Sequence, residues 1–170
     1  MAVLLFSSLV LYPLVNSSGS SGGTLTGKAT YDVINNGFSP KIEVDKAIYN
    51  FGTVSQSQGN VSTTFTITNS GSGDLIIDGM ETSCMCTSAS IIYQGGEGPK
   101  FGMGMHGDNP ENYKLVIPAG DSATLKVYYD PLAHGKQKTA QEKIIREITI
   151  KSNDPLNFQK KVRIEVTQVP

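Results

Sequence analysis

The dominant feature of this sequence is a series of short runs in which apolar and polar residues alternate. Residues 61–68 (VSTTFTIT) are the clearest example, because Val61, Phe65 and Ile67 fall on one side of the pattern. Successive side chains of a β-strand point to opposite faces of the sheet, so a period of two residues predicts a strand with one buried face.

Similar runs recur about every ten residues, and turn-forming residues separate them. The strand-like runs are residues 41–45, 48–54, 61–68, 75–81, 87–93, 113–117, 122–129, 147–151 and 162–169. No stretch keeps a helical period for long, and only residues 139–145 could form one or two helical turns. Seven to nine short strands at this spacing predict an all-β fold, namely an immunoglobulin-like β-sandwich formed by residues 41–170.

The alternation also predicts the core. The residues expected to face it are Phe65, Ile67, Leu75, Ile77, Leu125, Val127, Ile148, Ile150, Val162 and Ile164.

The N-terminal residues 1–23 are expected to be a leader with its linker, and residues 24–40 a further linker. Residues 2–15 (AVLLFSSLVLYPLV) are apolar and uncharged, but they are fewer than the roughly 20 residues that a membrane helix needs. Small residues follow, as at a signal-peptide cleavage site, although no Lys or Arg precedes the run. The sequence therefore predicts a signal peptide, with a membrane anchor as the alternative. Export to the periplasm, the cell surface or the medium is expected, with membrane contact only through the leader.

The charge balance and the absence of known catalytic motifs argue against several classes of function. The chain has 14 basic and 15 acidic residues and a formal net charge of −1, so no nucleic-acid partner is expected. It contains no nucleophile elbow, phosphate-binding glycine loop or HExxH motif. A non-catalytic protein is therefore predicted.

The two cysteines, Cys84 and Cys86, are separated by one residue. On an extended strand or strand end they would share one face, with Cα atoms about 6–7 Å apart. A disulfide holds its two Cβ atoms about 3.8 Å apart, so a bond between Cys84 and Cys86 would require a bent backbone. Two thiols on one face suit a shared metal ion, and the alternative is that both are small side chains of the core.

Further soft ligands lie near these cysteines in sequence. The two histidines are His106, in a glycine-rich run with Met103 and Met105, and His134, which follows the run 122–129. Thiolate, thioether and imidazole together favour copper(I), and zinc is the second choice. The predicted metal ligands are Cys84, Cys86, His106 and His134, with Met105 or Met103 completing the set or replacing one member. Taken alone, the methionine run is more typical of a flexible surface turn than of a metal ligand.

Several motifs, in their order along the chain, resemble the domain-of-unknown-function 1573 family. They are residues 51–54 (FGTV), 65–71 (FTITNSG), 75–77 (LII), 83–87 (SCMCT), 117–121 (IPAGD) and 150–155 (IKSNDP). The resemblance covers about residues 41–168. It departs from the usual pattern at Met85, where the family has Gly, and at residues 119–121, where it has Pro-Gly-Glu. The resemblance implies an exported immunoglobulin-like sandwich, related to PapD-like and major-sperm-protein-like folds, and implies no activity.

Two classes of function follow from these observations. The first is an exported copper-binding module for capture, delivery or storage of the ion. The second is a structural or adhesive module of the cell surface or of a filament, whose sheet edges pair with other copies or with other cell-surface proteins.

Overall fold

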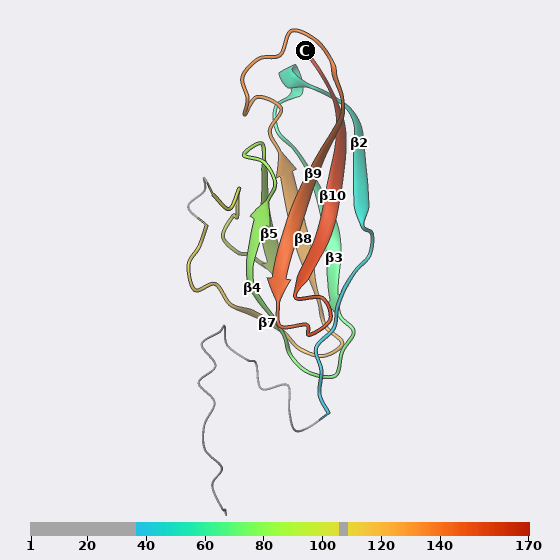
Figure 1. Cartoon of the computed structure of the whole chain (residues 1–170), viewed down its shortest axis with the longest axis vertical. Helices are drawn as coiled ribbons and strands as arrows, with labels where there is room; N and C mark the ends of the chain where they lie inside the picture. Colours follow the sequence, from blue (N-terminus) through green and yellow to red (C-terminus); the bar gives the residue numbers. More distant parts are fainter. Residues whose placement is uncertain (1–36, 106–108) are drawn as a thin grey trace, which may run out of the picture. The chain divides into compact units, whose positions relative to one another are not determined.

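The computed structural model describes residues 37–105 and 109–170, so the leader and His106 lie outside the described part. Within it, ten strands form two five-stranded sheets (Figure 1). The predicted all-β sandwich is confirmed, because the helical content of the described residues is a single 3-10 turn, Gln56–Gln58. No helix in this part of the chain is long and apolar enough to cross a membrane.

The two sheets draw their strands from both halves of the chain. In the first sheet the order is β1 (Ile42–Val44), β3 (Val61–Asn69), β8 (Ser122–Tyr129), β5 (Thr87–Tyr93) and β6 (Gly96–Glu97). In the second it is β2 (Ile48–Ser55), β10 (Gln159–Val169), β9 (Gln141–Ser152), β4 (Leu75–Thr82) and β7 (Leu115–Ile117). The β2–β10 pair is parallel, and the other neighbours are antiparallel.

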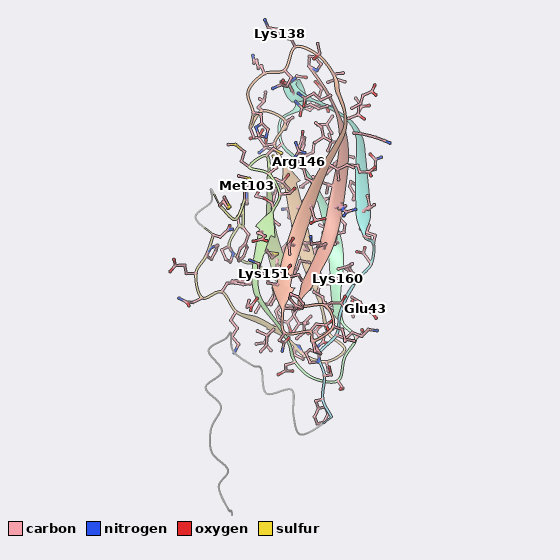
Figure 2. The ribbon with its side chains drawn as sticks, in the orientation of Figure 1. Glu43, Met103, Lys138, Arg146, Lys151 and Lys160 are labelled. Carbon is pink, nitrogen blue, oxygen red and sulfur yellow. The ribbon has the colours of Figure 1, made fainter. Side chains whose placement is uncertain are left out.

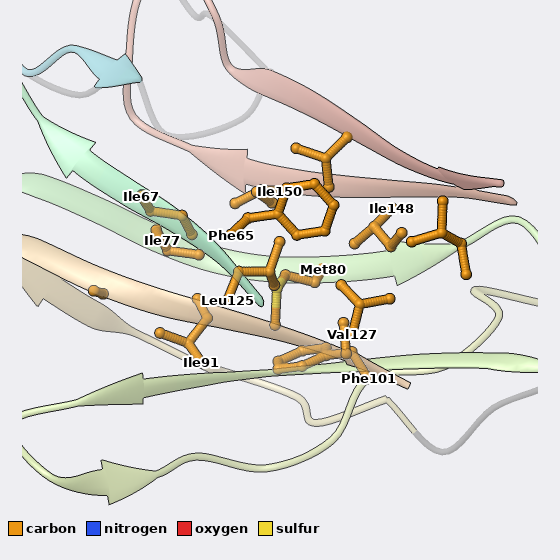
Figure 3. Packing of buried hydrophobic residues seen from close by; sticks show 14 of the residues in the cluster. Phe65, Ile67, Ile77, Met80, Ile91, Phe101, Leu125, Val127, Ile148 and Ile150 are labelled. Carbon is orange, nitrogen blue, oxygen red and sulfur yellow. The ribbon is translucent and has the colours of Figure 1, made fainter. Parts of the chain in front are cut away.

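The core lies between the sheets, and every residue predicted for it is at most 1% exposed. Figure 3 shows Phe65, Leu125 and Ile148 packed there with Met80, whose exposed fraction is 2%. These residues are in the core because each occupies an inward position of a strand whose next residue faces outward. Burial of this apolar surface is the main contribution that stabilises the sandwich.

Strand β9 differs from the sequence prediction. It begins at Gln141, so most of the segment 139–145, considered above for a helical turn, is extended. Its residues pair with β10, for example Ile144 with Val166 and Ile145 with Glu165. Pairing with a neighbouring strand thus decides a conformation that the local sequence leaves open.

Two of the sequence motifs, residues 65–71 and 150–155, contribute buried hydrogen bonds at the end of the sandwich where β3 and β9 end. Asn69 is fully buried, and its side chain donates to the carbonyls of Gly73 and Ile117. Asp154, 1% exposed, accepts from the backbone N–H of Ile42 at 2.9 Å. The motif residues Asn69 and Asp154 therefore satisfy buried backbone groups where loops cross between the sheets.

Candidate metal centre

The cysteines occupy the turn that joins β4 in one sheet to β5 in the other. The N–H of Thr87 donates to the carbonyl of Cys84 at 3.0 Å, and the hydroxyl of Thr82 donates to the same carbonyl at 3.0 Å. The N–H of Cys86 points to Cys84 Sγ at 3.4 Å. The prediction of an extended backbone at this pair is therefore wrong. The turn brings the two sulfur atoms to 2.7 Å, with both cysteines as free thiols.

This turn is attached to the middle of β9. The N–H of Ser83 donates to the carbonyl of Glu147, and the N–H of Glu147 donates to the Ser83 hydroxyl, each at 2.9 Å. The residue before Glu147 is Arg146, whose Nε donates to Cys86 Sγ at 3.1 Å. Two reciprocal hydrogen bonds therefore fix a guanidinium group beside the second thiol.

His134 reaches the turn from the connection between β8 and β9. Thr87 pairs with Tyr129, so the start of β5 lies beside the end of β8, and the N–H of Asp130 donates to the carbonyl of Cys86 at 2.8 Å. A tight turn follows and ends at Gly135, whose φ of 79° suits glycine. This path places His134 Nε2 3.1 Å from Cys84 Sγ.

Three of the predicted ligands thus converge. The potential ligand atoms of Cys84, Cys86 and His134 all lie within 4.8 Å of one another. Metal–sulfur bonds of about 2.3 Å would hold two thiolates roughly 4 Å apart in a trigonal site. The sulfur atoms, 2.7 Å apart here, need to separate by about 1.3 Å to admit an ion.

Exposure differs among the three ligands. Cys86 is buried, with an exposed fraction of 2%, Cys84 is partly buried, and His134 is exposed. An ion at this position would therefore be held from below by sulfur and be reachable from solvent past the imidazole.

Hydrogen bonds place negative charge on one thiol in preference to the other. Burial opposes ionisation of Cys84, but hydrogen bonds from the thiol and N–H of Cys86 and from His134 outweigh it and lower the pKa of Cys84 to about 7. Burial, and then the neighbouring Cys84, raise the pKa of Cys86. Near neutral pH the pair is therefore a thiolate at Cys84 that accepts a hydrogen bond from the Cys86 thiol.

Two of the predicted ligands, Met103 and Met105, lie on a groove that borders the cysteine turn. Met103 and Met105 line a groove of about 590 Å³ together with Glu81, Ser83 and Glu147. The side chain of Met105 is 88% exposed. Met103 and Arg146 are both labelled in Figure 2. The groove reaches Ser83, the residue before Cys84, and Met103 forms a parallel β-bridge with Thr82. The predicted contributions of Met103, Met105 and His106 stay predictions, and His106 lies outside the described residues.

Arg146 is the functional residue that the sequence did not reveal. It precedes the strand-like run that the alternation identifies, and no motif links it to Cys86, 60 residues earlier. The one signal in the sequence is that a basic residue stands directly before the run 147–151.

Comparison with known proteins supports the fold and the family resemblance. Residues 42–97 match the family described as Protein of unknown function (DUF1573). The predicted family resemblance is confirmed over this segment. The DUF1573 match contains Cys84 and Cys86, whereas His134 and Arg146 come from the part of the chain beyond it. No curated protein matches this chain in sequence.

Comparison with solved structures places this fold in another protein as well. The chain is similar to a protein of unknown function from Porphyromonas gingivalis W83, with 16% identity and a TM-score of 0.58 over 81% of this chain. It spans about half the length of that protein, 51%. It also resembles PapD-like domain 7 of human CEP192 (9% identity, TM-score 0.40, 86% of this chain and 96% of that chain). A further match is the CooA pilin subunit of enterotoxigenic Escherichia coli (11% identity, TM-score 0.41, 76% and 97%). The likeness to the P. gingivalis protein establishes a shared fold.

Proposed function

We propose that this protein is an exported copper(I)-binding module in which Cys84, Cys86 and His134 hold the ion. The observation that carries the proposal is the convergence of two sulfur atoms and one imidazole nitrogen within 4.8 Å of one another. Two thiolates and an imidazole form a soft, low-coordinate ligand set of the kind that copper(I) prefers.

The charge of Arg146 favours copper(I) over zinc. Two thiolates and Cu⁺ make a complex of charge −1, and the guanidinium 3.1 Å from Cys86 Sγ neutralises it. Two thiolates and Zn²⁺ make a neutral complex, which leaves the cation without a counter-charge in a partly buried place. Uncompensated charge is costly where water is restricted, so the monovalent ion fits better.

The graded exposure of the ligands supports capture and delivery of the ion rather than permanent storage. Because His134 is exposed and Cys86 is buried, a partner's ligand could replace the imidazole first while the sulfur atoms still hold the ion. The apolar segment 2–15 supports export, since it has the length and composition of a signal-peptide core.

A structural or adhesive role is the second candidate, and an exposed sheet edge favours it. Strand β2 is eight residues long and lies at the edge of its sheet, where β10 is its partner on one side. Its first residue, Ile48, is 47% exposed. An edge of this length can accept a strand from another copy or from another cell-surface protein.

Copper(I) titration of the reduced protein against a chromogenic chelator tests the proposed function. We expect the parent to retain one copper ion per chain, and the double variant C84S/C86S to retain none. Met85 lies between the cysteines and is 60% exposed, so M85L is a matched control that should bind as the parent does. Far-ultraviolet circular dichroism should show the same β-rich spectrum for all three. Copper binding by the folded double variant equal to that of the parent would sink the proposal and favour the structural role.

A further inference from the structure

The two cysteines differ in their access to solvent although their sulfur atoms are in contact. Cys84 is partly exposed next to Met85, which is 60% exposed, whereas Cys86 is 2% exposed. A molecule arriving from solvent therefore meets Cys84 first. Once bound there, it leaves Cys86 within reach of Cys84 Sγ, because the turn holds the two sulfur atoms together.

Each sulfur atom also has its own polar neighbour. His134 Nε2 lies 3.1 Å from Cys84 Sγ, and Arg146 Nε lies 3.1 Å from Cys86 Sγ. A guanidinium group beside Cys86 stabilises negative charge on that sulfur when it attacks or leaves in an exchange reaction. Separate polar neighbours suit a two-step sulfur exchange, in which each thiol has a task of its own.

From this arrangement we infer a further activity: the turn is a thiol–disulfide exchange centre, in which Cys84 reacts with the partner and Cys86 resolves the mixed disulfide. The inference stands on the exposure and contacts of the two thiols and does not rest on copper binding. The partner class is a disulfide in a peptide or a small molecule, since Cys84 is partly exposed and is the more accessible of the two thiols.

The reaction balances in two steps. The Cys84 thiolate attacks a disulfide RSSR, so that a Cys84–SR bond forms and one RS⁻ leaves. The Cys86 sulfur then attacks Cys84 Sγ, so that the Cys84–Cys86 bond forms and the second RS⁻ leaves. The protein dithiol loses two electrons, the partner disulfide gains them, and the two thiol protons end on the two RSH products. The reverse sequence oxidises a dithiol partner.

Intact-mass spectrometry of the reduced full chain, treated with glutathione disulfide in the presence of a metal chelator, tests the inference. The parent should lose two hydrogens and keep no glutathione. The C86S variant should accumulate one glutathione on Cys84, because the resolving sulfur is missing. The C84S variant should react at about one-tenth of the parent's rate or more slowly still, because Cys86 is shielded from the reagent. The L156A variant, which changes an 86% exposed side chain in the turn after β9, should behave as the parent, and circular dichroism should confirm that each variant is folded.

Two results would overturn the exchange centre: a parent that retains glutathione without forming its internal disulfide, or single variants that react at equal rates. The copper titration of the reduced parent keeps the two proposals apart. A parent that exchanges disulfides but binds no copper contradicts only the proposed function. A parent that binds copper but cannot resolve the mixed disulfide contradicts only the exchange activity.

Discussion

Arg146 and Cys86 form a charge-assisted contact, in which the guanidinium Nε donates to the sulfur atom over 3.1 Å. Burial disfavours the charged guanidinium, but the hydrogen bond to Cys86 and the negative charge of the cysteine pair outweigh it and raise the pKa of Arg146. The cation is therefore permanent at all pH values where the protein is folded. It lies where it can compensate negative charge on the sulfur atoms of the turn between β4 and β5.

The first prediction concerns metal selectivity. Replacing Arg146 by Gln removes the cation that neutralises a copper(I) dithiolate, so copper(I) affinity should fall about tenfold. Zinc affinity should stay the same or rise, because its dithiolate complex is already neutral. Competition titrations with copper(I) and zinc chelators measure the ratio of the two affinities.

Arg163→Gln is the matched control for this change. Arg163 lies on β10 and pairs with Glu147 at 3.1 Å, so the variant removes the same formal charge without touching a thiol. Its ratio of copper to zinc affinity should equal that of the parent. Equal losses of copper and zinc affinity in R146Q would show that Arg146 does not select the ion.

The second prediction concerns pH. Hydrogen bonds in the folded state, working against burial, lower the pKa of Cys84 from 9.0 to about 7. Between pH 7 and 9 the folded state holds fewer protons at this thiol than the unfolded state, so stability should rise with pH across that window. Below pH 7 this contribution is lost, and copper binding should weaken as protons compete for the sulfur.

Two measurements check the pH prediction. The ultraviolet absorbance of the thiolate should titrate with a midpoint near pH 7 in the parent and be absent there in C84S. The midpoint of urea unfolding should rise between pH 7 and 9 in the parent and be less steep in C84S. A thiolate that forms only near pH 9 would contradict the hydrogen-bonded arrangement of Cys84.

Much of the fold could be predicted from the sequence because period-two alternation reports a local property, the inward face of a strand. For this reason the predicted burial of Phe65 and Leu125 in the core is confirmed. The start of β9 could not be predicted in the same way, because Ile144 is extended through its pairing with Val166, a residue far along the chain.

The part of the candidate site that could be predicted is the part that lies next to strand ends. Cys86 and His134 each lie close to a strand-like run, and the pairing of Thr87 with Tyr129 brings the adjoining strand ends together. The Arg146 contact depends on a turn that docks on a strand 60 residues away, and no local pattern encodes that geometry.

The third prediction concerns Asp154, a buried carboxylate in the turn after β9. It accepts from the N–H groups of Ile42, Leu156 and Asn157 at 2.9, 2.8 and 3.0 Å. Replacing it by Ala leaves these donors without that acceptor, so unfolding free energy should fall by about 3 kcal/mol. Urea denaturation measures the loss. The exposed Glu111→Ala should change stability by less than about 0.5 kcal/mol. A D154A variant as stable as the parent would show that water satisfies these groups equally well.

The last prediction separates the fold from the site. Leu125 is fully buried on β8, where it pairs with Phe65 on one side and Ile91 on the other. Replacing it by Ala should lower the unfolding free energy by about 2–5 kcal/mol, because it removes packing and leaves a cavity between the sheets.

Leu156, which is 86% exposed, provides the matched control, and L156A should cost less than about 0.5 kcal/mol. Both variants should bind copper(I) as the parent does in native buffer, because neither change touches the turn at Cys84. Chemical denaturation and copper titration of the same preparations test both statements. If folded L125A lost copper binding, the geometry of the thiols would depend on core packing at Leu125, and the site could not be treated as a property of the turn and its neighbours Arg146 and His134.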